Sequence, residues 1–166
     1  MTWKLYVNLS SDFGAQDDYD RELRKLFRNL EFRKALSHAM DRDTMGQSVA
    51  RGPFFHPHAG GFSAGSPFHR FEDSIYYGYN VDGANSILDG LGLIDSDGNG
   101  IRNIPNGGED IALDILFSNE RSTDIKIGDS IVPMFEAVGL KPILKPSNDT
   151  AGITDAGNWN LYINRH

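Results

Sequence analysis

The stretch from Asn29 to Gly52, NLEFRKALSHAMDRDTMGQSVARG, decides the expected fold. Apolar residues in its first half recur at intervals of three and four, and this spacing places side chains on one face of a helix. These residues are Phe32, Ala35, Leu36, Ala39 and Met40. A continuous apolar face on a helix must pack against other elements. The stretch therefore predicts a helix that is buried on one side.

Asn29 and Asp41 are expected to cap two consecutive helices within this stretch. An Asn or Asp side chain in front of a helix accepts a hydrogen bond from a free backbone N–H of the first turn. Met45 and Val49 continue the apolar side after Asp41, and Gly52 is a typical stop signal. We therefore expect two short helices joined at Asp41.

Patterns on both sides of this stretch predict strands. Apolar and polar residues alternate from Trp3 to Leu9 and from Ile111 to Phe117, as in a strand with one buried face. Shorter strands are expected at 141–145 and 159–163. Because helices are expected between several of these strands, the sequence predicts an α/β domain.

The remaining helices are expected at three places along the chain. One helix follows a cap at Asn80 and ends near Gly90, and a second runs from Ser122 or Thr123 to Gly139. Pro133 is expected to kink the second helix or to shift its start. A single helical turn is expected at 21–27, and the polar ranges 10–20 and 147–157 are expected to be loops.

Composition excludes several classes of protein. The chain has 166 residues, a net charge of −7 and no cysteine, so it forms no disulfide and no thiol chemistry is available. It has neither a long apolar run nor a dense block of Lys and Arg, which argues against a membrane span and against a nucleic-acid partner. Catalytic signatures such as Gly-x-Ser-x-Gly, the Walker loop and His-Glu-x-x-His are also lacking. An enzyme and a bound cofactor are therefore not expected.

A segment dense in glycine, proline and aromatic residues follows Gly52. It includes five phenylalanines between Phe54 and Phe71, and its prolines and glycines argue against regular structure. A loop of this length is usually functional or disordered, and the aromatic residues argue against disorder. Two interpretations stay open: the loop covers the core of its own domain, or it forms part of the wall of a cleft.

The string from Asp95 to Gly100, DSDGNG, matches the first half of a calcium-binding EF-hand loop. Asp95, Asp97 and Asn99 supply oxygen ligands at positions 1, 3 and 5. The second half does not match, because Arg102 stands where an apolar residue is expected and Asn106 where a bidentate Glu is needed. The three residues are thus a weak calcium candidate, and the alternative is a glycine-rich turn whose side chains bond to their own backbone.

Four segments, taken in order, resemble the family 5 extracellular solute-binding proteins, the ligand-binding subunits of peptide, oligopeptide and nickel ABC importers. The first is FRKALSHAMDR at 32–42, the signature-like run. The second is YNVDGANSIL at 79–88, in which Val81 replaces the usual proline. The others are GLIDSDGNGIR at 92–102 and VGLKPI at 138–143.

The resemblance implies a fold, a domain assignment and a location. It implies an α/β lobe of the type II periplasmic binding proteins, with a mixed sheet flanked by helices. Residues 1–166 are expected to form a single domain, most of the C-terminal lobe of a two-lobed protein, with Met1 an added initiator residue. A periplasmic or extracellular location follows, with the first lobe of the same chain as a partner.

The corner after the strand at 111–117 is the expected ligand-binding site. Ligands collect at the carboxyl ends of strands in open α/β sheets, and Ser118, Asn119 and Arg121 follow such an end. In peptide-binding relatives an arginine near this corner binds the carboxyl end of the ligand, and the resemblance implies that role for Arg121. The alternative is a surface ion pair between Arg121 and Glu120 or Asp124.

The aromatic loop supplies the other candidate ligand contacts. In the family this region borders the ligand cleft, which implies contacts from Phe54, Phe55 and His56. Because some members transport nickel, His56, His58 and His69 are candidate metal ligands. No carboxylate or Cys accompanies them in sequence, so solvated loop histidines are the favoured interpretation and no metal site is expected.

The function implied is the solute-binding subunit of an ABC importer, which takes peptides or a similar small solute to the permease. Sugar and nickel remain alternatives for the solute. A second function is a stand-alone α/β interaction or regulatory module that uses the loop from Phe54 to Phe71. A third is a calcium-stabilised domain of an extracellular hydrolase.

Overall fold

The computed structural model describes residues 3–50, 67, 77–105 and 108–165. Its elements are, in chain order, β1 (Trp3–Val7), α1 (Asp18–Arg28), α2 (Leu30–Ala39), α3 (Arg42–Ala50), α4 (Val81–Gly90), β2 (Ala112–Ser118), α5 (Ser122–Glu136), β3 (Lys141–Ser147), α6 (Thr150–Asp155) and β4 (Leu161–Arg165). The aromatic loop from Phe54 to Phe71 lies outside the described residues, Pro67 apart. The two interpretations of that loop are therefore still open.

Four strands form one mixed sheet in the order β1-β4-β2-β3. Strand β2 pairs in parallel with β3 and with β4, whereas β1 pairs with β4 in the antiparallel direction. The carboxyl ends of β2, β3 and β4 consequently lie at the same edge of the sheet as the start of β1. The mixed sheet and the α/β class predicted from the sequence are confirmed.

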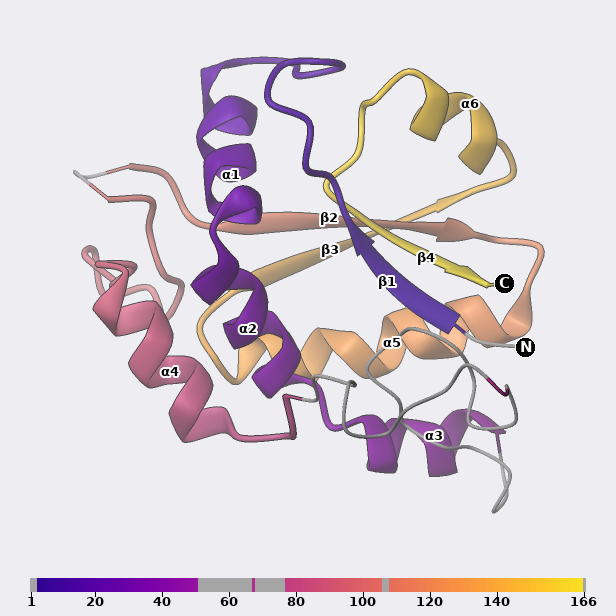
Figure 1. Ribbon diagram of the computed structural model, residues 1–166, viewed down its shortest axis with the longest axis horizontal. Coiled ribbons are helices and arrows are strands. Elements are labelled where there is room, and N and C mark those ends of the chain that lie inside the picture. The colour runs from indigo at the N-terminus through magenta and orange to yellow at the C-terminus, as the bar shows by residue number, and fades with distance from the viewer. Residues whose placement is uncertain (1–2, 51–66, 68–76, 106–107, 166) are drawn as a thin grey trace.

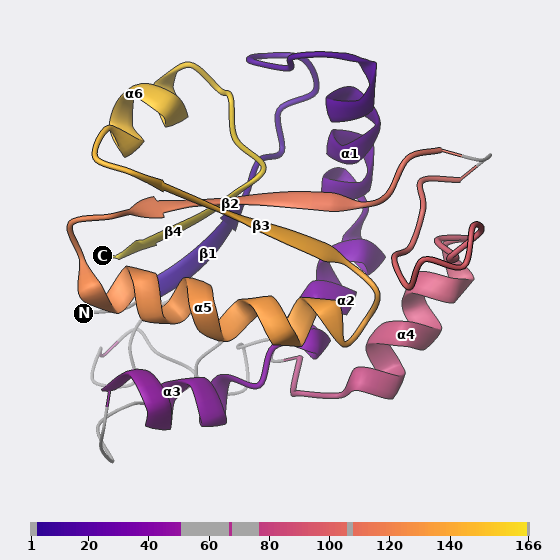
Figure 2. The ribbon, with the colours of Figure 1, turned by 180° about the vertical axis from the view of Figure 1, so that it is seen from behind.

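Helices cover both faces of the sheet. Helix α5 lies along one face and α6 lies on the opposite side, while α1, α2 and α4 gather at the far end from the start of β1 (Figure 1). The view from behind shows α5 running beneath β2 and β3 (Figure 2). A Cβ added at Gly128 of α5 would lie 3.3 Å from the ring of Phe117 on β2, so a small residue lets this helix approach the sheet closely.

The helix predicted from the opening stretch is the centre of the core. Phe32, Ala35, Leu36 and Ala39 of α2 are buried, and Met40 is 9% exposed. The Asn29 side chain accepts from the backbone N–H of Glu31 at 2.9 Å, and Asp41 accepts from that of Thr44 at 3.0 Å. Both predicted caps are therefore confirmed, as is the cap at Asn80, which accepts from Gly83 at 2.8 Å.

Two helices were missed or underestimated. The single turn expected at 21–27 is a helix of 11 residues that begins after Asp17, whose side chain caps it. The loop predicted at 147–157 contains α6, which Asp149 caps in the same way. The apolar residues of α1 recur at helical spacing, so its pattern was present in the sequence, whereas α6 spans only six residues and is marked by its Asp cap alone.

Proline lies inside both a helix and a strand of this fold. Helix α5 runs through Pro133 without interruption and begins at Ser122 as predicted. Strand β3 extends to Ser147 and contains Pro142 and Pro146. The backbone N–H of Lys141 donates to the carbonyl of Ile111, the residue before β2, so alternate residues of β3, the two prolines among them, have their nitrogens directed away from β2. An edge strand tolerates proline there because no neighbouring strand needs the donor.

A buried arginine fastens α1 to the rest of the domain. Arg24 is fully buried and donates to the carbonyl oxygens of Phe13 at 2.6 Å and Gly157 at 2.9 Å, and to Asp20 at 3.1 Å. Gly157 has a φ of +73°, and a Cβ there would lie 2.5 Å from the ring of Phe13. Only glycine fits this close approach, which holds the loop after β1 against the loop before β4.

Candidate functional site

The carboxyl edge of the sheet brings the predicted corner together with a second loop. The backbone N–H of Asn119 donates to the carbonyl of Ser147 at 3.1 Å, which joins the end of β2 to the end of β3. Ser118 is buried, and its hydroxyl accepts from the backbone N–H of Glu120 at 3.4 Å. Asn119 is exposed. Hydrogen bonds thus fix the backbone of this corner, from which the side chains of Asn119 and Arg121 project.

Arg121 lies immediately before α5 and is held at one end. Its Nη1 atom is 3.5 Å from Oδ2 of Asp124 and 3.3 Å from Oδ1 of Asn164 on β4. The Arg121 side chain is 35% exposed, while that of Asp124 is 1% exposed. The ion pair with Asp124 that the sequence left as an alternative is therefore present. Whether Arg121 also contacts a ligand stays a prediction.

Asp124 connects Arg121 to the first strand. Its Oδ1 atom accepts a hydrogen bond from the indole Nε1–H of Trp3 at 3.0 Å. Asp124 lies in the first turn of α5, where a negative charge is stabilised by the positive end of the helix dipole. One buried carboxylate thus links α5, β1 and, through Arg121, β4.

Sequence reasoning missed Trp3 and Asn164 as members of this edge. Trp3 was assigned only to the buried face of a strand, and Asn164 lay beyond the predicted end of the last strand. The antiparallel register pairs Trp3 with Arg165 and Lys4 with Asn164, which places both ends of the described chain beside Arg121. This pairing joins residues more than 150 positions apart, so a local pattern could not reveal it.

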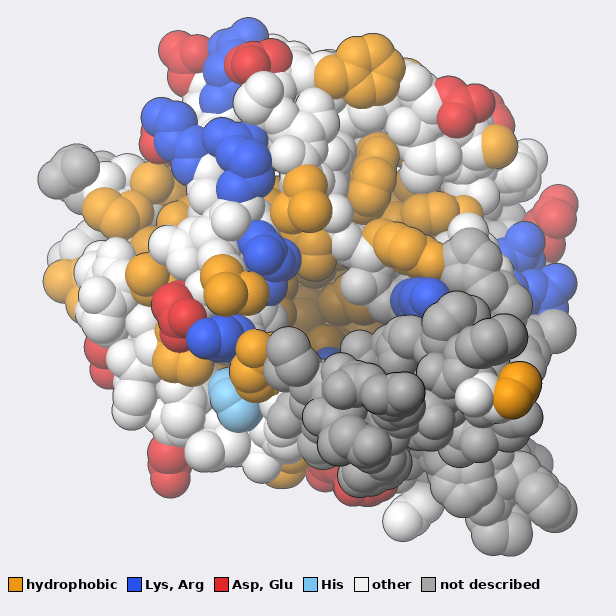
Figure 3. All heavy atoms as spheres, in the orientation of Figure 1, with side chains coloured by type: hydrophobic (Ala, Val, Ile, Leu, Met, Phe, Trp, Pro, Cys, Tyr) orange, Lys and Arg blue, Asp and Glu red, His pale blue; other side chains and the backbone are white. Residues whose placement is uncertain are grey.

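Half-buried aromatic side chains continue inward from the edge. The rings of Tyr6 and Tyr162 are 6.4 Å apart, and those of Trp159 and Tyr162 are 6.1 Å apart. The Tyr162 hydroxyl lies 3.2 Å from that of Thr150 at the start of α6. Hydrophobic side chains gather over β1 and β4 in the space-filling view (Figure 3). Aromatic rings thus lie along β1 and β4, from Trp159 before β4 to Tyr6 and Tyr162 within the strands, and the polar side chains lie at the carboxyl edge.

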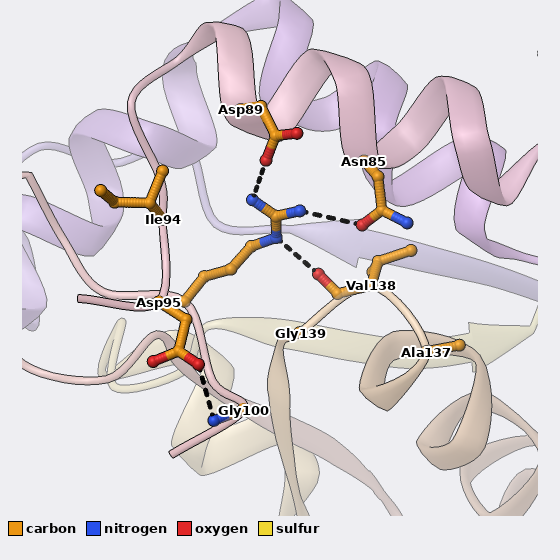
Figure 4. Close-up of a pocket in the computed structure, with 9 residues that line it drawn as sticks. Asn85, Asp89, Ile94, Asp95, Gly100, Ala137, Val138 and Gly139 are labelled. Carbon is orange, nitrogen blue, oxygen red and sulfur yellow. Dashed lines mark hydrogen bonds and ion pairs between the residues drawn. The ribbon is translucent and has the colours of Figure 1, made fainter. Parts of the chain in front are cut away.

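A second arginine lines a pocket of about 230 Å³ at a distance from this edge. Arg102 donates from Nε to the carbonyl of Val138 at 2.8 Å, from Nη1 to Asp89 at 2.6 Å and from Nη2 to Asn85 at 2.9 Å. Nη1 also donates to the carbonyl of Leu93. Figure 4 shows Asp89 and Asn85 directed from their helix toward the guanidinium group. Arg102 is thus occupied in joining α4 to the corner after α5.

The weak calcium candidate forms a turn in which side chains bond to the backbone. Asp95 accepts from the backbone N–H of Gly98 at 2.7 Å and of Gly100 at 2.8 Å. The hydrogen bond from Gly100 is the main reason that the pKa of Asp95 lies below its usual value. Asn99 accepts in turn from Ile101 at 2.7 Å. This is the geometry of the alternative interpretation, a glycine-rich turn.

The other candidate residues lie outside the described part of the chain. They are Phe54, Phe55, His56, His58 and His69. Among residues 3–50, 67, 77–105 and 108–165, no cluster of three or more His, Cys, Asp or Glu side chains has the geometry of a metal site. Within the same ranges, no helix is long and apolar enough to cross a membrane.

Comparison with known proteins identifies relatives along the whole chain. The family model of the bacterial extracellular solute-binding proteins, family 5 Middle, matches residues 1–166. The periplasmic alpha-galactoside-binding protein of Rhizobium meliloti (strain 1021) is 33% identical over 170 residues, which is 98% of this chain and 24% of that protein. This relative is periplasmic and a binding protein by its name, in agreement with the location expected from the sequence.

Solved structures give the same result for the fold. The periplasmic binding protein MelB from Agrobacterium fabrum C58, in complex with stachyose, superposes with a TM-score of 0.93 at 29% identity, over 99% of this chain and 25% of that one. The oligopeptide-binding protein OppA superposes with a TM-score of 0.82 at 22% identity, over 97% and 24%. The chain spans about a quarter of the length of these relatives. It belongs to the family 5 bacterial extracellular solute-binding proteins.

Proposed function

We propose that residues 1–166 are most of the C-terminal lobe of a two-lobed protein that binds a solute outside the cytoplasm and delivers it to an ABC permease. Family membership over the whole chain supports this assignment. The described residues share one sheet and one apolar core, as a single lobe requires. In such proteins the lobes close around the solute by a hinge motion. The first lobe of the same chain supplies the opposite wall of the cleft.

The solute proposed is an oligosaccharide that contains α-galactoside units. The single observation that carries this choice is the similarity to two saccharide-associated proteins, one named for alpha-galactosides and one solved with stachyose. Their identities, 33% and 29%, exceed the 22% shared with the oligopeptide-binding protein. The peptide expected from the sequence therefore becomes the second candidate.

The chemistry of the carboxyl edge suits a sugar. A saccharide offers hydroxyl groups that both donate and accept hydrogen bonds, and Asn119, Asn164 and Arg121 can meet them. Aromatic rings such as those of Trp159 and Tyr162 suit the apolar faces of pyranose rings. Because Arg121 already has an anionic partner in Asp124, an uncharged solute leaves the edge electrically balanced.

A peptide remains the second candidate because Arg121 keeps donors for a carboxylate. Only its Nη1 atom contacts other residues in the described part of the chain, so Nε and Nη2 can form two parallel bonds with a ligand. The stand-alone interaction module is disfavoured, since the family model covers residues 1–166. No nucleic-acid partner is proposed for a chain with a net charge of −7.

A thermal-shift panel on the full-length protein tests the proposal. Solutes that bind only the native state raise the melting temperature, and at 100 times Kd the stabilisation is about 2.7 kcal/mol. We expect stachyose and raffinose to raise it and tetrapeptides, maltotetraose and Ni²⁺ to leave it unchanged. A shift with peptides alone would replace the sugar by the second candidate.

A further inference from the structure

We propose that Asp124 sets the charge class of the solute, because it neutralises Arg121 from within the protein and leaves its free donors for uncharged hydroxyl groups. The inference rests on the proposed function in one respect, since it takes Arg121 as a residue that contacts the solute. It goes further by naming a positioning residue and by stating that carboxylate-bearing solutes are rejected.

The burial of Asp124 is the first step. Its side chain is 1% exposed, so no water competes with its two protein donors, the indole of Trp3 at 3.0 Å and the guanidinium of Arg121 at 3.5 Å. A buried carboxylate without a cationic partner is strongly unfavourable. Arg121 is therefore held beside Asp124 whether or not a solute is bound.

The orientation of Arg121 is the second step. Both of its contacts use Nη1, one to Asp124 and one to Asn164, which fixes that end of the planar group between α5 and β4. Within the described residues, Nε and Nη2 have no protein acceptor, and the side chain is 35% exposed. The Nε and Nη2 donors of the guanidinium therefore have a fixed direction, which a selective hydrogen-bond donor requires.

The charge balance is the third step. A carboxylate brought to Arg121 would share that cation with Asp124, and two anions would then face one positive charge. The other charged residues of this edge, Lys4, Glu120 and Arg165, are all exposed, so solvent and salt screen them far more than the buried carboxylate. A neutral hydroxyl accepts from Nε or Nη2 without this repulsion.

The test compares two solutes that differ only in charge. The full-length protein is titrated by calorimetry with stachyose and with stachyose whose terminal galactose is oxidised at C6 to a carboxylate. The wild type is expected to bind stachyose at least tenfold more tightly than the uronate. Asp124→Asn keeps an acceptor for Trp3 but removes the charge, and it is expected to shift this ratio at least tenfold toward the uronate.

A matched control separates this effect from a general loss of charge. Asp114 on β2 pairs with Lys145 at 3.4 Å and is 42% exposed, so Asp114→Asn is expected to leave the ratio unchanged. If Asp124→Asn does not fold, Arg121→Gln is used instead. This variant is expected to lower the affinity for the uronate by a larger factor than the affinity for stachyose.

Each remaining outcome decides between the two proposals. A wild type that binds the uronate as tightly as stachyose overturns the role of Asp124 and leaves the proposed function intact. An Asp124→Asn variant whose affinity falls equally for both solutes also overturns the role of Asp124, because a purely structural role would have that effect. A wild type that binds neither saccharide overturns the proposed function and the inference with it.

Discussion

Arg102 and Arg121 are both arginines at the junction of a helix and a strand, yet their surroundings differ in a way that separates structure from function. Arg102 uses Nε, Nη1 and Nη2 in bonds to two carbonyls and two side chains and is 12% exposed. Among the described residues, Arg121 forms hydrogen bonds through Nη1 alone, and its side chain is 35% exposed. The first has its hydrogen bonds satisfied by the fold, whereas the second keeps donors for something outside it.

The comparison teaches that a pocket and a binding site need not coincide. The cavity beside Arg102 is lined by groups already bonded to one another, so most donors of its guanidinium are used within the protein. The solute site proposed at Arg121 lies at the edge of the sheet, where the first lobe is proposed to supply the opposite wall. If Arg121 binds the solute as proposed, free donors locate the site in a single lobe better than the hollow does.

Replacing Arg102 gives the largest expected effect. Arg102→Ala leaves the carbonyls of Val138 and Leu93 without their donor, and an unsatisfied buried group costs about 1–3 kcal/mol, so we expect a loss of about 2–4 kcal/mol in unfolding free energy. Urea denaturation measures this loss, and calorimetry is expected to give an unchanged solute affinity. Arg102→Lys is the matched control, with a smaller loss. A large fall in affinity would break the comparison.

Replacing Arg121 is expected to lower the solute affinity, which Arg102→Ala leaves unchanged. In the full-length protein Arg121→Ala removes one or two charge-assisted hydrogen bonds to the solute, each worth about 1.5–3 kcal/mol, so affinity should fall roughly tenfold to a hundredfold. Stability should fall as well, because the buried carboxylate of Asp124 loses its cationic partner, so the solute affinity is the measurement that separates this variant from Arg102→Ala. Unchanged affinity in a calorimetric titration would refute the binding role of Arg121.

Replacing Asp89, the exposed ion-pair partner of Arg102, tests how much the ion pair alone contributes to stability. Asp89 is 61% exposed, and exposed ion pairs typically contribute about 0.2–1 kcal/mol. Asp89→Asn should therefore lower the unfolding free energy by less than 1 kcal/mol, well below the loss in Arg102→Ala. An equal loss would mean that the ion pair, and not the bonds to the carbonyls, holds this corner together.

The smallest effect is expected from the turn beside the same pocket. The pKa of Asp95 is lowered by bonds from the backbone N–H groups of Gly100 and Gly98. The stability that it contributes is present above the unfolded pKa and is lost as the pH falls below about 4, through the folded pKa. Asp95→Asn should flatten this acid loss in melting-temperature measurements. Millimolar Ca²⁺ is expected to produce no shift, and a clear shift would revive the calcium candidate.

The fold was largely predictable because its patterns are local. The apolar spacing of residues 32–40 gave α2, and the capping residues Asn29, Asp41 and Asn80 gave the starts of three helices. Helix α6 was not predicted, and for α1 only a turn at 21–27 was predicted; α6 is a six-residue helix marked only by its cap Asp149. The buried role of Arg24 was also missed, because no local pattern distinguishes it from a surface arginine.

The candidate site was predictable only in part. Its corner followed from the rule that ligands gather at the carboxyl ends of strands, and the family resemblance selected Arg121 there. Trp3 and Asn164 join it through the pairing of β1 with β4, which no local pattern contains. The contact between Arg121 and Asp124 was foreseen as an alternative to ligand binding, yet the geometry allows both, because it uses only Nη1.

The most direct test of the account is a crystal structure of the full-length protein with stachyose. The account predicts that Nε or Nη2 of Arg121 lies within hydrogen-bond distance of a sugar hydroxyl, that Nη1 still contacts Asp124, and that no solute atom lies beside Arg102. A saccharide bound away from Arg121, or one that enters the pocket at Arg102, would contradict it.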